Sequence, residues 1–213
     1  MTQLLVNPST LLGTRKLAKF ISLATNPALI VSLSIITVVS YYADSLEKIW
    51  QGSLSGIGLL VVPGILYSIY IWRQEGAVNL DLTERHDRVL PLLLASLGAV
   101  IGSFLVQSNL NSQIFTEMSY ILATLLVALT IVTTVWKISL HAATLAGLVS
   151  ILTIYRSEWF ALGYLILLPV AWSRLKLRQH TPSQLIFGAL LGAALTFASA
   201  WFLSCLSLTT CSR

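Results

Sequence analysis

Charge is scarce in this chain: Asp, Glu, Lys and Arg make up 10% of its 213 residues, while 56% are hydrophobic. A soluble domain could not hide that much apolar surface, so a soluble globular protein is excluded. The mean hydropathy of +0.82 and the recurrent apolar runs predict a polytopic membrane protein instead. At this length we expect one all-α transmembrane bundle and not two domains.

Cysteine is also nearly absent. Cys205 and Cys211 both lie near the C-terminus, and there is no C-x-x-C pair or Cys/His cluster. A zinc site is therefore not expected. Two unpaired thiols are one interpretation, and a small disulfide loop is the other if that end faces an oxidising compartment. Residues 1–9 lack a basic region followed by an apolar core, so we expect no cleaved signal peptide.

Apolar segments close to the roughly 20 residues of a bilayer span recur along the chain. They predict a transmembrane domain over 26–205 with six to seven spans, preceded by a basic segment (1–25) and followed by a tail (206–213). The expected helices are 27–43, 54–74, 89–108, 117–136, 140–156, 158–173 and 182–205. The fifth and sixth are short and can form a tight hairpin.

The N-terminal segment 11–24 carries Arg15, Lys16 and Lys19 and is too polar to span a bilayer. We expect it to lie flat as an amphipathic interfacial helix; a disordered basic tail is the alternative. Seven spans would place ten cations on the side of this segment and three on the other. That excess predicts a cytoplasmic or stromal location for the cation-rich side. All three histidines, His86, His141 and His180, fall on it.

Polar side chains concentrate between the last two expected helices, where 174–184 reads RLKLRQHTPSQ. His180 precedes a helix that begins near Pro182, and His141 opens another, with Ser139 as its expected N-cap. Helix N-termini favour anions, and arginine offers a bidentate fork to phosphate oxygens. The pattern therefore predicts a phosphate site that includes Arg174.

The loop 79–91 is the most charged part of the chain. Arg85 and Arg88 are three residues apart and share a face if the loop is helical. One interpretation is a solvated loop with internal ion pairs. The other is that one or both arginines close the anion site. On the last helix, Gly188 and Gly192 form a small-residue face that predicts close helix packing.

These residues resemble the three motifs of the type 2 phosphatidic acid phosphatase (PAP2) superfamily, K-x6-R-P, P-S-G-H and S-R-x5-H-x3-D. The third motif reads Ser173-Arg174-x5-His180-x3-Gln184, and the second reads Ile138-Ser139-Leu140-His141. The first aligns Arg88 with the family arginine and places Asp81 at the lysine position. The resemblance covers residues 73 to about 192 and is strongest in the third motif.

The resemblance implies a PAP2-like core and a role for each matched residue. His180 would be the nucleophile and His141 the general acid. The phosphate oxygens would be held by Arg174, Arg88, Arg85 and Ser139, and the resemblance implies no metal or other cofactor. Gln184 stands where the family has an aspartate that orients the nucleophile, and Asp81 replaces a lysine. Asp81, Arg85, Arg88 and Pro91 also match the spacing D-x3-R-x2-R-x2-P of a divergent branch, in which these departures are a variant design.

Two functions follow as expectations. The first is an integral-membrane phosphatase that hydrolyses a lipid or isoprenoid (prenyl) phosphate through a phosphohistidine. The second is a non-catalytic membrane protein that keeps the pocket for an anion or lipid headgroup, for which Gln184, Asp81 and Leu140 argue. Anion transport has little support, because no broken-helix repeat is visible. The expected partners are the bilayer and the lipid substrate, without nucleic acid; the oligomeric state is left open.

Overall fold

The computed structural model describes residues 8–75, 85–109 and 112–211, and every secondary-structure element in these ranges is a helix. The first five α-helices are α1 (Pro8–Ala24), α2 (Pro27–Tyr42), α3 (Leu46–Leu60), α4 (Val62–Glu75) and α5 (Arg85–Asn109). They are followed by α6 (Gln113–Val135), α7 (Leu140–Tyr155), the 3-10 helix η1 (Glu158–Ile166), α8 (Leu167–Lys176) and α9 (Pro182–Cys211). The all-α prediction is confirmed for this part of the chain.

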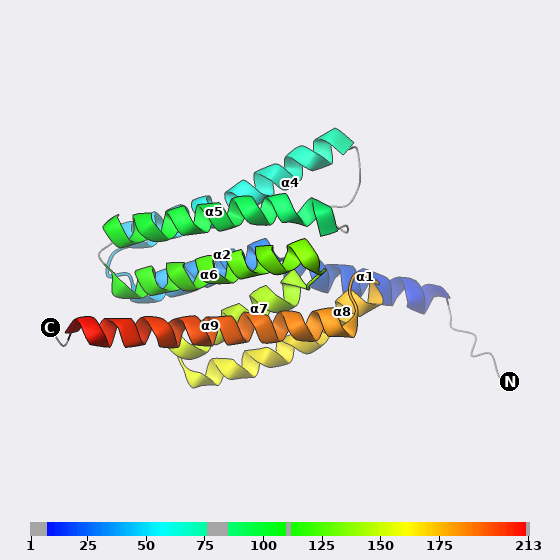
Figure 1. The fold of residues 1–213 in the computed structure, drawn as a ribbon. Helices are drawn as coiled ribbons and strands as arrows, with labels where there is room; N and C mark the ends of the chain where they lie inside the picture. Colours follow the sequence, from blue (N-terminus) through cyan, green and yellow to red (C-terminus); the bar gives the residue numbers. More distant parts are fainter. Residues whose placement is uncertain (1–7, 76–84, 110–111, 212–213) are drawn as a thin grey trace.

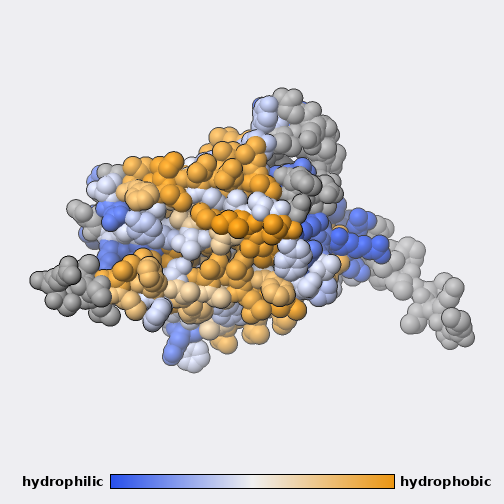
Figure 2. Space-filling view, viewed as in Figure 1, coloured by the Kyte–Doolittle hydropathy of each residue, from blue (hydrophilic) through white to orange (hydrophobic). Residues whose placement is uncertain are grey.

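Among the residues that the structure describes, three helices are long and apolar enough to cross a membrane: α5, α6 and α9. The pair α1 and α2 adds a fourth if it counts as one span bent by 43°. These helices expose large apolar side chains such as Leu97, Phe104 and Trp201. Figure 2 shows apolar residues over the middle of the bundle, with hydrophilic residues gathered toward its ends. This arrangement is consistent with an integral membrane protein.

Three of the expected helices differ clearly from those observed, in continuity or in length. The segment 54–74 is not one helix: α3 begins earlier, at Leu46, and the chain breaks at Val61 before α4. Pro63 follows this break, and proline lacks the N–H that a continuous helix would need there. The segment 158–173 is likewise divided, into η1 and α8. The last helix continues to Cys211, past the expected boundary at 205, and Cys205 is a free thiol.

The helices pack closely where glycine removes a side chain. A Cβ added at Gly192 would lie 2.1 Å from the Ala143 carbonyl oxygen, and one added at Gly188 would lie 2.7 Å from that of Ser139. These contacts pair the early part of α9 with the early part of α7, so the two helices run parallel with their N-termini at one end. The predicted small-residue packing face is confirmed, and it brings two expected site segments together.

That end of the bundle holds all the described parts of the predicted site. In Figure 1, α5 and α9 begin there, and α1 lies there against α8. The opposite end has a separate polar cluster, in which the Tyr155 hydroxyl donates to Glu117 (3.1 Å) and Arg156 stacks over the Tyr41 ring (3.4 Å). Arg156 lies in this cluster, at the C-terminal end of α7, and is therefore remote from the predicted site.

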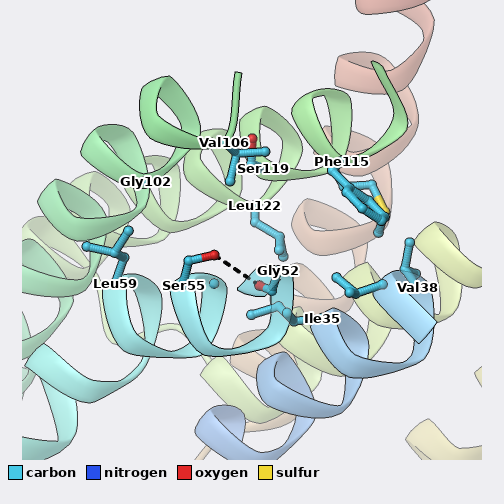
Figure 3. A pocket seen from close by; sticks show the side chains of 13 residues that line it. Ile35, Val38, Gly52, Ser55, Leu59, Gly102, Val106, Phe115, Ser119 and Leu122 are labelled. Atoms are coloured by element: carbon cyan, nitrogen blue, oxygen red, sulfur yellow. Dashed lines mark hydrogen bonds between the residues drawn. The ribbon is translucent and has the colours of Figure 1, made fainter. Parts of the chain in front are cut away.

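A small cavity of about 50 Å³ lies between α2, α3, α5 and α6 (Figure 3). The described residues that line it carry no ionisable side chain, and the Ser55 hydroxyl inside it donates to the Gly52 carbonyl oxygen (3.2 Å). We therefore regard it as a packing gap between close helices, without chemistry of its own.

Candidate functional site

A tight turn connects Arg174 to His180. The Gln179 N–H donates to the Arg174 carbonyl (3.1 Å), and the Arg178 N–H donates to the Leu175 carbonyl (3.0 Å). This pair of bonds closes the C-terminus of α8 as a Schellman motif, in which one residue adopts a left-handed conformation. Arg178 is that residue, with φ of 56°. The turn reverses the chain and places His180 directly before α9.

Gln184 holds the His180 ring in one orientation. Its side-chain oxygen lies 3.0 Å from His180 Nδ1 and 3.1 Å from the Thr181 backbone nitrogen. A backbone N–H can only donate, so the Gln184 atom that it meets is the carbonyl oxygen, an acceptor. His180 Nδ1 must therefore carry the proton in this bond. The neutral ring is then the tautomer whose Nε2 has a free lone pair.

His180 is buried, with 7% of its surface exposed. Its Nε2 has no hydrogen-bond partner among the residues that the structure describes. Burial, together with the positive charges of Arg88 and Arg174, lowers the pKa of His180 to about 3. The ring is consequently neutral near pH 7. A neutral imidazole with an unprotonated Nε2 is the form that acts as a nucleophile.

The start of α7 is fastened to the start of α9. Ser139 is the N-cap of α7, as predicted, and its hydroxyl accepts the Ala142 N–H (3.4 Å). Its own N–H donates to the Gln184 backbone carbonyl (3.3 Å). Ser139 is fully buried, so solvent water does not compete for this hydrogen bond. The second and third motifs are therefore joined through main-chain contacts.

His141 and Arg174 meet each other and the first helix. His141 Nε2 lies 3.4 Å from Arg174 Nη1 and 3.2 Å from the Ser22 carbonyl oxygen. Arg174 Nη1 also donates to the Ser22 hydroxyl. Arg174 has 1% of its surface exposed and Ser22 has 4%. Of the two predicted catalytic histidines, His141 is thus the one in direct contact with Arg174.

A cavity of about 400 Å³ opens beside this group. Arg88, His141 and Arg174 line its polar end, together with Thr144 and Asn26. The rest of the lining is largely apolar and comes mainly from α2, α4, α5 and α6, with Val61 at the break between α3 and α4. Its members include Val31, Ile65, Leu92, Ala95, Leu126 and Leu129. Its size is that of a typical small-ligand pocket. A molecule with an anionic head and an apolar tail matches both ends.

The remaining predicted residues are placed unequally. Arg88 is 4% exposed and lies in the first turn of α5, which Arg85 begins. Asp81 lies outside the described residues, and so do the side chains of Arg85 and His86. His180 and Ser139 are not among the described residues that line the cavity. The charges of Arg88 and Arg174, which do line it, nevertheless lower the pKa of His180.

Ser22 is the site residue that the sequence reasoning missed. Nothing in a serine within a basic, amphipathic N-terminal segment indicates a contact with an arginine 152 residues later. The only available signal was the period of α1, which places Ala18 and Ser22 four residues apart on one buried face. The expected helix over 11–24 does form and begins at Pro8, packed on α8.

Comparisons with family models, with curated proteins and with solved structures gave no match to this chain.

Proposed function

We propose that this protein is a PAP2-like integral-membrane phosphatase that hydrolyses a lipid or isoprenoid phosphate. The observation that carries the proposal is the state of His180, whose ring is buried and neutral. Its hydrogen bond to Gln184 keeps the proton on Nδ1, and its Nε2 has no hydrogen-bond partner in the described structure. The proposal includes six to seven spans around a PAP2-like core and a site on the cytoplasmic or stromal side.

The proposed reaction has two steps. His180 Nε2 attacks phosphorus, forming an N–P bond while the P–O bond to the lipid alcohol breaks, and His141 gives the leaving oxygen a proton. Water then attacks phosphorus, the N–P bond breaks, and the water proton returns to His141. Arg88 and Arg174 stabilise the charge on the transferred group. The products are the free alcohol and inorganic phosphate.

The cavity supports the substrate class. Its cationic end at Arg88 and Arg174 suits a phosphate monoester, and its apolar lining suits a hydrocarbon tail. A substrate held in this way would have its phosphate among the helix ends and its tail within the bundle. The neutral state of His180 favours attack on phosphorus over simple ion pairing with it.

A second function has its own support. The described lining of the cavity includes Arg88, His141 and Arg174 but not His180. A pocket that binds a lipid headgroup or another anion without hydrolysing it would have the same composition. In that case Gln184 and the tautomer of His180 would matter only for the stability of the turn.

The test is phosphate release by the purified full-length protein from a panel of lipid and prenyl phosphates. We expect release by the wild-type protein, loss with His180→Ala and Arg174→Ala, and retention with Arg156→Ala, which removes an arginine at the opposite end of α7. Wild-type release no greater than that of His180→Ala on every substrate would reject the phosphatase. Saturable phosphate-lipid binding in that case would favour the non-catalytic pocket.

A further inference from the structure

We infer that Ser22, on the N-terminal helix α1, is a positioning residue of the phosphate site. This inference rests on the proposed phosphatase function. No motif in the resemblance includes this helix. Ser22 nevertheless contacts both Arg174 and His141, one from each of the two best-matched motifs, and α1 is therefore a structural part of the site.

The contacts of Ser22 use both of its oxygen atoms. Its hydroxyl accepts from Arg174 Nη1, and its carbonyl oxygen lies 3.2 Å from His141 Nε2. Each of the three residues has less than a tenth of its surface exposed. In such an environment a hydrogen bond to a charged group is strong and its loss is costly. Ser22 thus contacts both an anion-binding residue, Arg174, and the proposed general acid, His141.

The carbonyl contact constrains the proton on His141. A carbonyl oxygen can only accept, so its contact with Nε2 is a hydrogen bond when Nε2 carries a proton. The Arg174 guanidinium can only donate, so its contact with Nε2 (3.4 Å) is a hydrogen bond only when Nε2 is bare. The shorter contact with Ser22 favours the protonated Nε2. The Ser22 carbonyl therefore helps to set which ring nitrogen of His141 carries a proton.

The rest of α1 holds Ser22 in place. One turn earlier, the Ala18 carbonyl accepts the Ser173 hydroxyl (2.6 Å), and Ala18 is fully buried against α8. After Ser22 the chain bends by 43°, and Asn26 caps α2 by accepting the Ala28 N–H (2.9 Å). Asn26 and Leu23 also line the cavity. The inner face of α1 is therefore fixed on α8 at the level of Arg174.

Ser22→Ala tests the role of the hydroxyl. Without its acceptor, Arg174 loses a fixed position, and a small displacement of a group that binds the transferred phosphoryl lowers kcat by about tenfold to a hundredfold. We expect KM to change by less than about threefold, since the guanidinium charge remains. Ser22→Thr keeps an acceptor oxygen in place and should retain kcat within about threefold of the wild-type value.

Ser150→Ala is the matched control, because it removes an equally buried serine hydroxyl from a contact between two helices, α7 and η1. The Ser150 hydroxyl lies 2.6 Å from the Tyr164 hydroxyl and does not contact the anion-binding group. We expect Ser150→Ala to lower the unfolding temperature about as much as Ser22→Ala while kcat stays within about threefold. Equal kcat values for Ser22→Ala and Ser150→Ala, or a Ser22→Thr variant as slow as Ser22→Ala, would overturn the role of Ser22.

A binding measurement separates this inference from the proposed function. Inorganic phosphate should raise the unfolding temperature of the wild-type protein and of Ser150→Ala, and should have a smaller effect on Ser22→Ala. If the wild-type protein releases no phosphate yet keeps this pattern, the phosphatase is rejected and Ser22 still positions the anion site. If phosphate shifts Ser22→Ala as much as wild type, the role of Ser22 is rejected.

Discussion

The Gln184 side-chain oxygen accepts a hydrogen bond from His180 Nδ1, at 3.0 Å. The same oxygen accepts the Thr181 N–H, which identifies it as the carbonyl oxygen of the amide. A glutamine at this position therefore still orients the ring and sets its tautomer. It lacks only the negative charge with which a carboxylate would stabilise the phosphohistidine of the proposed reaction.

Gln184→Glu should separate orientation from charge. A glutamate has the same length and can accept both hydrogen bonds, and it adds the missing negative charge. We expect kcat to rise by about tenfold or more, because such a carboxylate stabilises the imidazolium formed during reaction. Gln184→Leu removes both bonds and should lower kcat. Steady-state phosphate release measures both changes, and a slower Gln184→Glu variant would show that charge does not limit the rate.

Gly192→Ala should disturb the site from within the bundle. The new Cβ would lie 2.1 Å from the Ala143 carbonyl, so α9 must move away from α7. We expect a loss of about 1–3 kcal/mol in the free energy of unfolding, together with loss of phosphate release. Gly58→Ala is the control, since nothing lies within 4 Å of its added Cβ. It should be neutral or stabilising by up to about 1 kcal/mol.

Arg178→Gly should stabilise the turn before His180. Arg178 has φ of 56°, a left-handed conformation that costs a residue with a Cβ about 1–2 kcal/mol and glycine very little. After the greater backbone freedom of glycine in the unfolded chain is subtracted, we expect a gain of about 0.5–1 kcal/mol. Lys176→Gly, at the last residue of α8, should instead lower stability by up to about 1 kcal/mol. Unfolding in detergent would measure the stability of both variants. An Arg178→Gly variant less stable than the wild-type protein would contradict the left-handed conformation of Arg178.

The pH dependence of stability should reveal the buried state of His180. Its pKa is lowered from 6.5 to about 3, so between these values the unfolded chain binds more protons than the folded protein. Stability attributable to His180 is therefore complete above about pH 6.5 and is lost as the pH falls toward 3, by at most about 1.4 kcal/mol per pH unit. His180→Gln should show a shallower decline between pH 6.5 and 4.5. Identical slopes for the two proteins would contradict a buried, neutral His180.

Patterns with a local cause were predictable from the chain. The apolar segments around α5, α6, α7 and α9, the Ser139 cap and the Gly188–Gly192 packing face all follow from periodicity, caps and small residues. The break at Val61 was also signalled by a nearby proline, although the sequence reasoning placed one continuous helix there. The expected six to seven spans depend on how these shorter helices sit in a bilayer, which length and composition alone do not decide.

By itself the sequence determined that the chain is an apolar helical protein whose histidines and arginines cluster near helix ends. Helix periodicity and capping act over a few residues, so such features can be read locally. Only the tertiary structure decided that Ser22 meets Arg174 and that an amphiphile-sized cavity lies beside them. These relationships depend on the packing of α1 on α8, which joins residues more than a hundred positions apart and has no local signature.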